Sequence, residues 1–257
     1  MFNDKEKILV DISPTGIIIH KKDTGKFDKI PLETGIIKDY KADSLELAKV
    51  LKANLKASGV LLVLDIPNTM RLISYDVTEK DFSQIAKYHI QDHFPFPLDK
   101  YTVSYRRLDK SSTVLAAAAE TEIIESYTKT FEKAKIKIKR LDIRQNFISQ
   151  CISQVEKSDI ILAMKQRENI LIQFIDEGIL KFLLEWDGMD INRAFAPYIY
   201  NKGKVAVKKV FLFSCIGISD ELTRYFNQLG VDVIYIDEIY EKFDFFNTKP
   251  YNKSAIK

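Results

Sequence analysis

The most constraining feature of this 257-residue chain is an order of predicted elements that occurs twice. Three short strands, a helix and an apolar strand are expected first at residues 8–13, 15–21, 27–30, 44–58 and 60–66. The same order returns about 150 residues later, at 160–165, 169–176, 179–186, 190–200 and 207–213, and a helix (220–229) and a strand (231–235) follow it. Because a repeated supersecondary unit reflects architecture, the sequence predicts two similar halves.

A different stretch, residues 81–150, separates the two copies. Apolar residues recur at spacings of three and four between Phe82 and His93, which predicts an amphipathic helix. Phe94-Pro95-Phe96-Pro97 ends it, because proline lacks an amide donor and disfavours helix in the residue before it. We therefore expect residues 93–98 to be extended. Two alternating strands (102–108, 113–119), a helix (122–135) and a strand (136–142) complete a small α/β unit.

These patterns together predict an α/β protein with a duplicated core and an insertion. A duplicated β-β-β-α-β-α core is the layout of actin-like and ribonuclease H-like folds, and the insert is a small α/β subdomain. The predicted boundaries are a first half at 1–80, the insert at 81–150, a second and reduced half at 151–240, and a polar tail or linker at 241–257.

Part of this stretch resembles a known family. The runs HIQDHFPFPLDKYTVSYRRL and VLAAAAETEIIESYTKTFEKAKIKIKRLDI look like the inserted subdomain of the PilM family. PilM proteins are actin-like proteins on the cytoplasmic face of type IV pilus machines, and they are related to the GspL cytoplasmic domain of type II secretion. The likeness continues back through GIIKDYKADSLELAKVLKANLKASGVLLVLDIPNTMRLISYDV and covers about two thirds of the chain in order of elements.

The resemblance implies a partner and a groove. In the PilM family the short cytoplasmic tail of a PilN-like inner-membrane protein lies extended between the first half and the insert. On that basis Tyr88, Phe94 and Phe96 are predicted to line or support the groove, and ordinary packing inside the insert is the alternative reading of these side chains. The assembly ATPase is a candidate second partner.

The places where an actin-like ATPase binds nucleotide are degenerate in this chain. The first hairpin keeps an acid and a hydroxyl, Asp11 and Ser13, but Pro14 removes an amide donor. The second hairpin has Lys165 and its neighbours where an acid and a glycine are needed, and residues 213–218 carry one glycine where adenosine needs several. We expect a vestigial cleft containing Asp11, Ser13 and Lys165, with no cofactor and no catalysis. The alternative is an ATPase switch rebuilt around these three residues.

Metal and nucleophile motifs are also missing from the sequence. His89 and His93 have the spacing that places two imidazoles on one helix face, but Ile90 stands where a zinc peptidase needs glutamate, so no metal site is predicted. Cys151 and Cys215 lie in apolar contexts, which indicates buried thiols in a reducing compartment.

Charge and hydropathy limit the remaining classes. There are 39 Lys and Arg against 36 Asp and Glu, and a net charge of +3 is too weak for a nucleic-acid binder. The basic run at 136–140 alternates with apolar residues, as a half-buried strand does. No apolar run approaches the roughly 20 residues needed to span a bilayer. We therefore expect membrane contact through a partner or through a segment outside this chain, without direct insertion.

The resulting hypothesis is a non-catalytic cytoplasmic scaffold at the inner face of the cytoplasmic membrane. It would serve a type IV pilus or a related secretion machine by binding a PilN-like tail. A GspL-like cytoplasmic domain, in which the polar tail continues to a membrane segment, is a further alternative.

Overall fold

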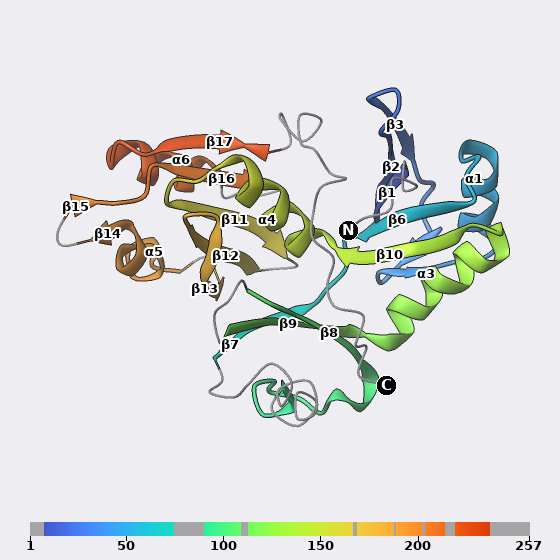
Figure 1. Cartoon of the computed structure of the whole chain (residues 1–257), viewed down its shortest axis with the longest axis horizontal. Helices are drawn as coiled ribbons and strands as arrows, with labels where there is room; N and C mark the ends of the chain where they lie inside the picture. The colour runs from blue at the N-terminus through green and yellow to red at the C-terminus, as the bar shows by residue number, and fades with distance from the viewer. Residues whose placement is uncertain are drawn as a thin grey trace. The chain divides into compact units, whose positions relative to one another are not determined.

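The fold is described from a computed structural model covering residues 8–74, 90–108, 113–166, 169–187, 189–201, 204–213 and 219–236 (Figure 1). The chain divides into two compact units, with the division between Phe147 and Ile148. Each unit is described by itself. No helix in these ranges is both long enough and apolar enough to cross a membrane.

A five-stranded mixed sheet forms the centre of the first unit. Its strands are β1 (Ile8–Ser13), β2 (Gly16–Lys21), β3 (Lys26–Pro31), β6 (Gly59–Leu64) and β10 (Lys137–Ile143), in the order β10-β6-β1-β2-β3. β1 pairs antiparallel with β2 and parallel with β6, and β6 pairs parallel with β10. From Val60 onward every residue of β6 is buried, as its continuous apolar run predicts for a central strand.

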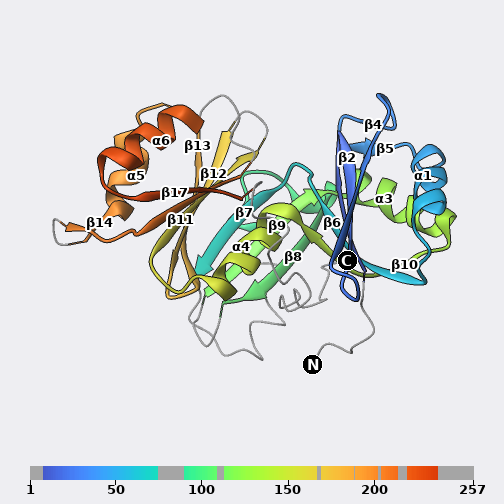
Figure 2. The same cartoon turned by 90° about the horizontal axis from the view of Figure 1, so that it is seen from above.

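Two helices lie on one side of this sheet (Figure 2). They are α1 (Glu46–Asn54) and α3 (Thr121–Ala134), and a two-stranded ribbon of β4 (Ile37–Lys38) and β5 (Lys41–Ala42) precedes α1. Asp43 starts α1, because its carboxylate accepts the amides of Leu45 (2.9 Å) and Glu46 (3.2 Å). The buried residues of α1 recur at helical spacing, as predicted.

A separate three-stranded antiparallel sheet forms the insert. It contains β7 (Thr69–Ser74), β8 (Tyr101–Arg107) and β9 (Thr113–Glu120) in the order β7-β9-β8, and the short helix η1 (Leu98–Lys100) leads into β8. One face of this sheet carries an apolar cluster made of Ile73, Ile90, Phe94, Val103, Tyr105, Val114, Ala116 and Ala118. The expected helix at 81–93 lies outside the described residues except for its last turn.

The insert is smaller than the sequence predicts. Residues 122–142 were expected to belong to it, but β10 pairs with β6 of the main sheet and α3 packs against α1. β7, which was expected in the first half, pairs with β9. The difference arises because periodicity identifies a strand without identifying its partner.

The second unit repeats the main sheet. Its strands are β11 (Ile160–Gln166), β12 (Asn169–Asp176), β13 (Ile179–Trp186), β16 (Lys209–Phe213) and β17 (Asp232–Tyr235), in the order β13-β12-β11-β16-β17. β11 pairs antiparallel with β12 and parallel with β16, as β1 does with β2 and β6. The predicted pair of similar mixed sheets is therefore confirmed. β16 corresponds to β6 and α6 corresponds to α3. The insert lies between β6 and α3 along the chain, whereas α6 is the next element after β16.

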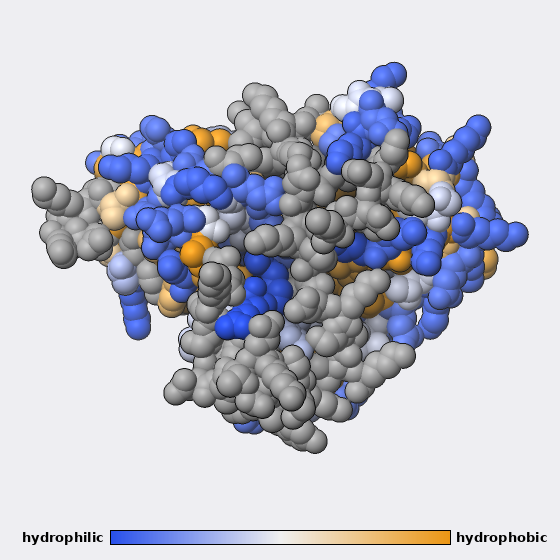
Figure 3. Space-filling view, in the orientation of Figure 1, coloured by the Kyte–Doolittle hydropathy of each residue, from blue (hydrophilic) through white to orange (hydrophobic). Residues whose placement is uncertain are grey.

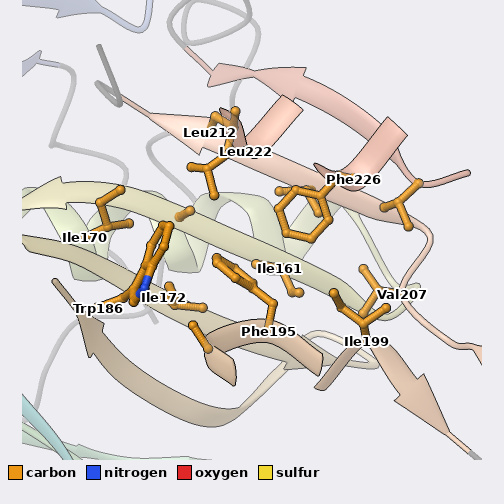
Figure 4. Packing of buried hydrophobic residues seen from close by; sticks show 14 residues of the cluster. Ile161, Ile170, Ile172, Trp186, Phe195, Ile199, Val207, Leu212, Leu222 and Phe226 are labelled. Atoms are coloured by element: carbon orange, nitrogen blue, oxygen red, sulfur yellow. The ribbon is translucent and has the colours of Figure 1, made fainter. Parts of the chain in front are cut away.

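The core of the second unit lies between its sheet and two helices (Figure 4). These are α5 (Ile191–Ile199) and α6 (Ser219–Gln228), and a small ribbon of β14 (Tyr200–Asn201) and β15 (Lys204–Val205) follows α5. Phe195 of α5 makes edge contacts with Trp186 and Phe226, with ring centres 5.4 and 5.1 Å apart. Trp186 is thus a core residue, as expected. Helix α4 (Arg144–Val155) begins in the first unit and ends in the second, where Cys151 is buried; Cys215 lies outside the described residues.

Candidate functional site

A cavity of about 400 Å³ lies within the first unit, between the insert and the main sheet. Its walls are β8 and β9 on one side and α3 and β10 on the other. This volume falls in the range of roughly 300–1,000 Å³ that ligand sites occupy. The cavity is therefore the first candidate for a binding site.

Small side chains form the insert wall of the cavity. Thr102, Ser104, Ala117 and Ala119 alternate along β8 and β9 with residues of the apolar cluster, so their side chains point to the opposite face of the sheet. Small side chains leave room for another backbone to approach the sheet. In the alanine run 116–119, Ala116 and Ala118 therefore pack in the apolar cluster, whereas Ala117 and Ala119 face the cavity.

The opposite wall includes an edge strand. β10 is the last strand of its sheet, and no strand in the described ranges pairs with its other side. Six consecutive residues of β10, Ile138 to Ile143, line the cavity, and the pairing register with β6 shifts between Ile138 and Arg140. An edge strand offers a row of main-chain donors and acceptors to an added strand. An extended peptide is the ligand that this wall fits.

A chain of polar side chains connects the two walls. The guanidinium of Arg140 donates to the Asp142 carboxylate (2.6 Å), Asn146 donates to the same carboxylate (2.8 Å), and Arg106 of β8 donates to the Asn146 side-chain oxygen (3.3 Å). Burial raises the pKa of Asp142, and Arg140 and Asn146 act against that rise. Arg106 belongs to the insert and Asn146 to α4. These hydrogen bonds therefore hold the insert wall against the main-sheet wall.

A second polar cluster lies near the carboxyl ends of β1, β6 and β10. Arg144, directly after β10, donates to both oxygens of Asp11 (3.0 and 3.1 Å from Nε, 2.6 Å from Nη2) and to Asp65 (2.6 Å from Nη1). Asp11 is 1% exposed, and the Asp65 side chain is 32% exposed. Burial raises the pKa of Asp65, Arg144 opposes the rise, and the charge of Asp11 adds to it.

This cluster does not suit a metal-bound nucleotide. Mg²⁺ requires oxygen ligands that are free to coordinate it. Both carboxylate oxygens of Asp11, the acid retained in the first hairpin, accept hydrogen bonds from Arg144 inside the protein. The guanidinium balances the charge of one of the two carboxylates, and a cation at Asp11 would have to displace these hydrogen bonds.

The other residues of the predicted cleft have local roles. The Ser13 hydroxyl donates to the Gly16 carbonyl (3.1 Å) across the β1–β2 turn. Lys165 is half-buried near the end of β11 in the second unit. The grouping of Asp11, Ser13 and Lys165 in one cleft would cross the two units and stays a prediction.

Two of the three predicted partner-binding aromatics, Phe94 and Phe96, lie behind the insert wall. Phe94 is 6% exposed within the apolar cluster, and Phe96 packs against that cluster and stacks on Tyr101 with ring centres 4.3 Å apart. This is the face of the sheet opposite to the cavity side chains. Phe94 and Phe96 are placed to support the wall, and their part in partner binding stays a prediction. Tyr88 lies outside the described residues.

The proline segment begins with a turn, where an extended segment was expected. The amides of His93 and Phe94 donate to the carbonyls of Ile90 and Gln91, so the chain still turns at these residues. The Gln91 side chain then donates to the Phe96 carbonyl (3.2 Å) and accepts the Leu98 amide (3.1 Å). The prolines correctly predicted where the helix ends. They could not predict that the Gln91 side chain would hydrogen-bond to the backbone of residues 96 and 98.

The fold of this protein resembles those of several solved structures. No protein-family model and no curated protein sequence matches the chain. It is similar to the solved structure of the "PilM-PilN type IV pilus biogenesis complex", with 12% identity, a TM-score of 0.65, and coverage of 90% of this chain and 88% of that chain. It is also similar to a Bacteroides thetaiotaomicron protein with an actin-like ATPase fold and unknown function, with 12% identity, a TM-score of 0.59, and coverage of 93% and 95%.

A further likeness is to the cytoplasmic domain of EpsL, an inner-membrane component of the Vibrio cholerae type II secretion system. The identity is 8%, the TM-score is 0.54, and 80% of each chain is covered. These likenesses confirm the predicted actin-like fold and its structural similarity to PilM.

Proposed function

We propose that this protein is a non-catalytic, actin-like scaffold of a type IV pilus or related secretion machine. It acts at the cytoplasmic face of the inner membrane, where it holds the extended tail of a PilN-like membrane protein. The observation that carries the proposal is the cavity along the edge strand β10, in a fold similar to that of a PilM-PilN complex.

The cavity suggests how a tail would be recognised. Main-chain groups of an extended tail would pair with the outer edge of β10, the last strand of its sheet, which gives affinity with little dependence on sequence. Side chains of the tail would enter the space left by Ser104, Ala117 and Ala119, and each large apolar side chain that becomes buried contributes about 1.5–3 kcal/mol. Phe94 and Phe96 would support this wall from behind, with Tyr88 as a further candidate. We expect micromolar affinity or tighter.

A scaffold without nucleotide chemistry agrees with the geometry of the retained acid. Asp11 is committed to Arg144, so the protein would bind its partner without an ATP-driven switch. The likeness to the EpsL cytoplasmic domain favours one second candidate, a GspL-like domain that recruits a secretion ATPase. An ATPase that bound this chain more tightly than the tail does would support that candidate.

The proposal is tested by filling the cavity. The full chain is titrated calorimetrically with a synthetic peptide of the cytoplasmic tail of the PilN-like protein from the same genome. Ser104→Trp should weaken binding at least about tenfold, because the loss of one buried side chain exceeds 1.4 kcal/mol. Ser74→Trp, at an exposed position of β7 outside the cavity, is the matched control and should bind like the parent. Equal binding by both variants would refute the site.

A further inference from the structure

One end of the first unit carries lysines from three segments. They are Lys56 in the α1–β6 connection, Lys133 and Lys135 at the end of α3, and Lys137 and Lys139 at the start of β10, here called the lysine edge. The segments meet there because the Lys137 amide donates to the Ser58 carbonyl (3.1 Å) and Lys137 lies opposite Gly59 in the parallel pairing. This end is at the right of Figure 1 and is mainly hydrophilic in Figure 3.

The side chains of the lysine edge are available to a partner. All five lysines are exposed. The carbon atoms of Lys139 lie over Gly59, where even a Cβ atom would come within 2.7 Å of them, so this side chain is directed along the edge. Lys133 donates to the Ser44 hydroxyl (2.6 Å), an uncharged partner.

The lysine edge brings together five lysines that form no ion pair with a described acidic residue. Lys21, Lys41, Lys49, Lys129, Lys181 and Lys209 each form an ion pair. None of the ion pairs within the described ranges involves the lysine edge. Asp43 lies near Lys133, but its carboxylate accepts hydrogen bonds from backbone amides at the start of α1. Segments 55–59 and 131–139 contain five lysines and a single acid, Glu132. A chain with a net charge of only +3 thus concentrates unpaired charge at one edge.

We propose that the lysine edge binds the anionic headgroups of a phospholipid surface directly. Clusters of four to eight basic residues are attracted to anionic leaflets, at about 1 kcal/mol for each residue near the surface. All five residues are lysines, which act as point charges, whereas arginine would favour bidentate recognition of individual phosphates. No aromatic residue in the two segments is exposed to stack on bases; Phe131 is buried in α3. A diffuse anionic surface therefore suits the edge better than nucleic acid does.

This inference goes beyond the proposed function and changes one expectation. The sequence predicts membrane contact only through a partner or through a segment outside this chain, and the alternation at 136–140 predicts only a solvated strand face. Neither reading could show that α3 and the α1–β6 connection bring two further groups of lysines to the same edge. Direct headgroup contact needs no inserted segment, and it would act together with a membrane-anchored tail.

The test compares two triple variants of the full chain in vesicle flotation. Vesicles of phosphatidylcholine with about 30% phosphatidylglycerol are compared with pure phosphatidylcholine at roughly 0.1 M salt. The first variant combines Lys56→Gln, Lys135→Asn and Lys137→Gln; asparagine suits position 135, whose φ is +59°. The control combines Lys157→Gln, Lys181→Gln and Lys208→Gln, at exposed positions of the second unit. Both variants lower the net charge by three.

We expect the parent and the control to bind anionic vesicles, and the first variant to bind at least about tenfold more weakly. Equal loss in both variants, or equal binding of the parent to both vesicle types, would overturn the proposal. If the parent bound a short DNA duplex as tightly as anionic vesicles, and only the first variant lost this binding, the edge would be assigned to nucleic acid instead. Because Lys139 and the cavity are unchanged, the first variant should bind the partner tail normally, so a failure here leaves the tail proposal standing.

Discussion

Replacing Arg144 by methionine tests the buried ion cluster, because it removes the hydrogen bonds that Arg144 donates to Asp11. Asp11 is 1% exposed and loses three close contacts to Arg144, whereas Asp65 is 32% exposed and can be rehydrated. Breaking one side of a buried ion pair costs about 3–5 kcal/mol. Since only one of the two carboxylates is fully buried, we expect a loss of about 3 kcal/mol in the free energy of unfolding.

Urea denaturation followed by far-UV circular dichroism measures this loss, and hydrogen exchange in β1 locates it. Adding Asp11→Asn to Arg144→Met should restore at least half of the stability, because the buried carboxylate charge that lost Arg144 is then removed as well. A loss below about 1 kcal/mol would refute the role of Arg144.

Three further predictions concern Glu156, Tyr127 and nucleotide binding. Lys209 and Ser158 hold the pKa of Glu156 at about 2, so its contribution is present above about pH 4.5 and is lost as the pH falls toward 2. Glu156→Gln should cost about 1 kcal/mol at pH 7 and less at pH 3, and an equal cost at both values would contradict this. The Tyr127 hydroxyl is buried with no hydrogen-bond partner among the described residues, and burial raises its pKa, so Tyr127→Phe should raise the melting temperature. A clear fall in the melting temperature would contradict this. Millimolar Mg-ATP should not change the melting temperature, whereas a ligand at 100 times its Kd would add about 2.7 kcal/mol and a shift of several degrees.

Most of the fold could be predicted because each half is built from local patterns that repeat. The apolar run of β6 and the succession of strands and helices along the second unit follow from periodicity and turn residues. The partner of β10 could not be predicted, since a strand of alternating lysine and isoleucine fits either sheet. Only long-range pairing with Gly59 to Leu64 assigns β10 to the first half.

The sequence predicted the location of the candidate site, a groove beside the insert, better than it predicted the residues that line it. The resemblance pointed to a groove beside the insert, and the cavity lies there. The aromatic residues attracted attention because they are large and rigid, yet Phe94 packs behind the wall. Ser104 and the alanines form the open face because they are small, and small residues give no positive signal in a sequence. Arg144 was missed because its partners are 133 and 79 positions away.

Hydrogen exchange with and without the partner tail tests the central claim most directly. The full chain is compared with and without saturating synthetic tail peptide, and peptic fragments report protection along each strand. If the tail adds to the edge of β10, amides in Lys137–Ile143 and in Tyr101–Arg107 should exchange more slowly when it is bound. β3 (Lys26–Pro31), the opposite edge of the same sheet, should be unchanged and serves as the internal control. Protection of β3 or of the second unit, with β10 unchanged, would contradict the account.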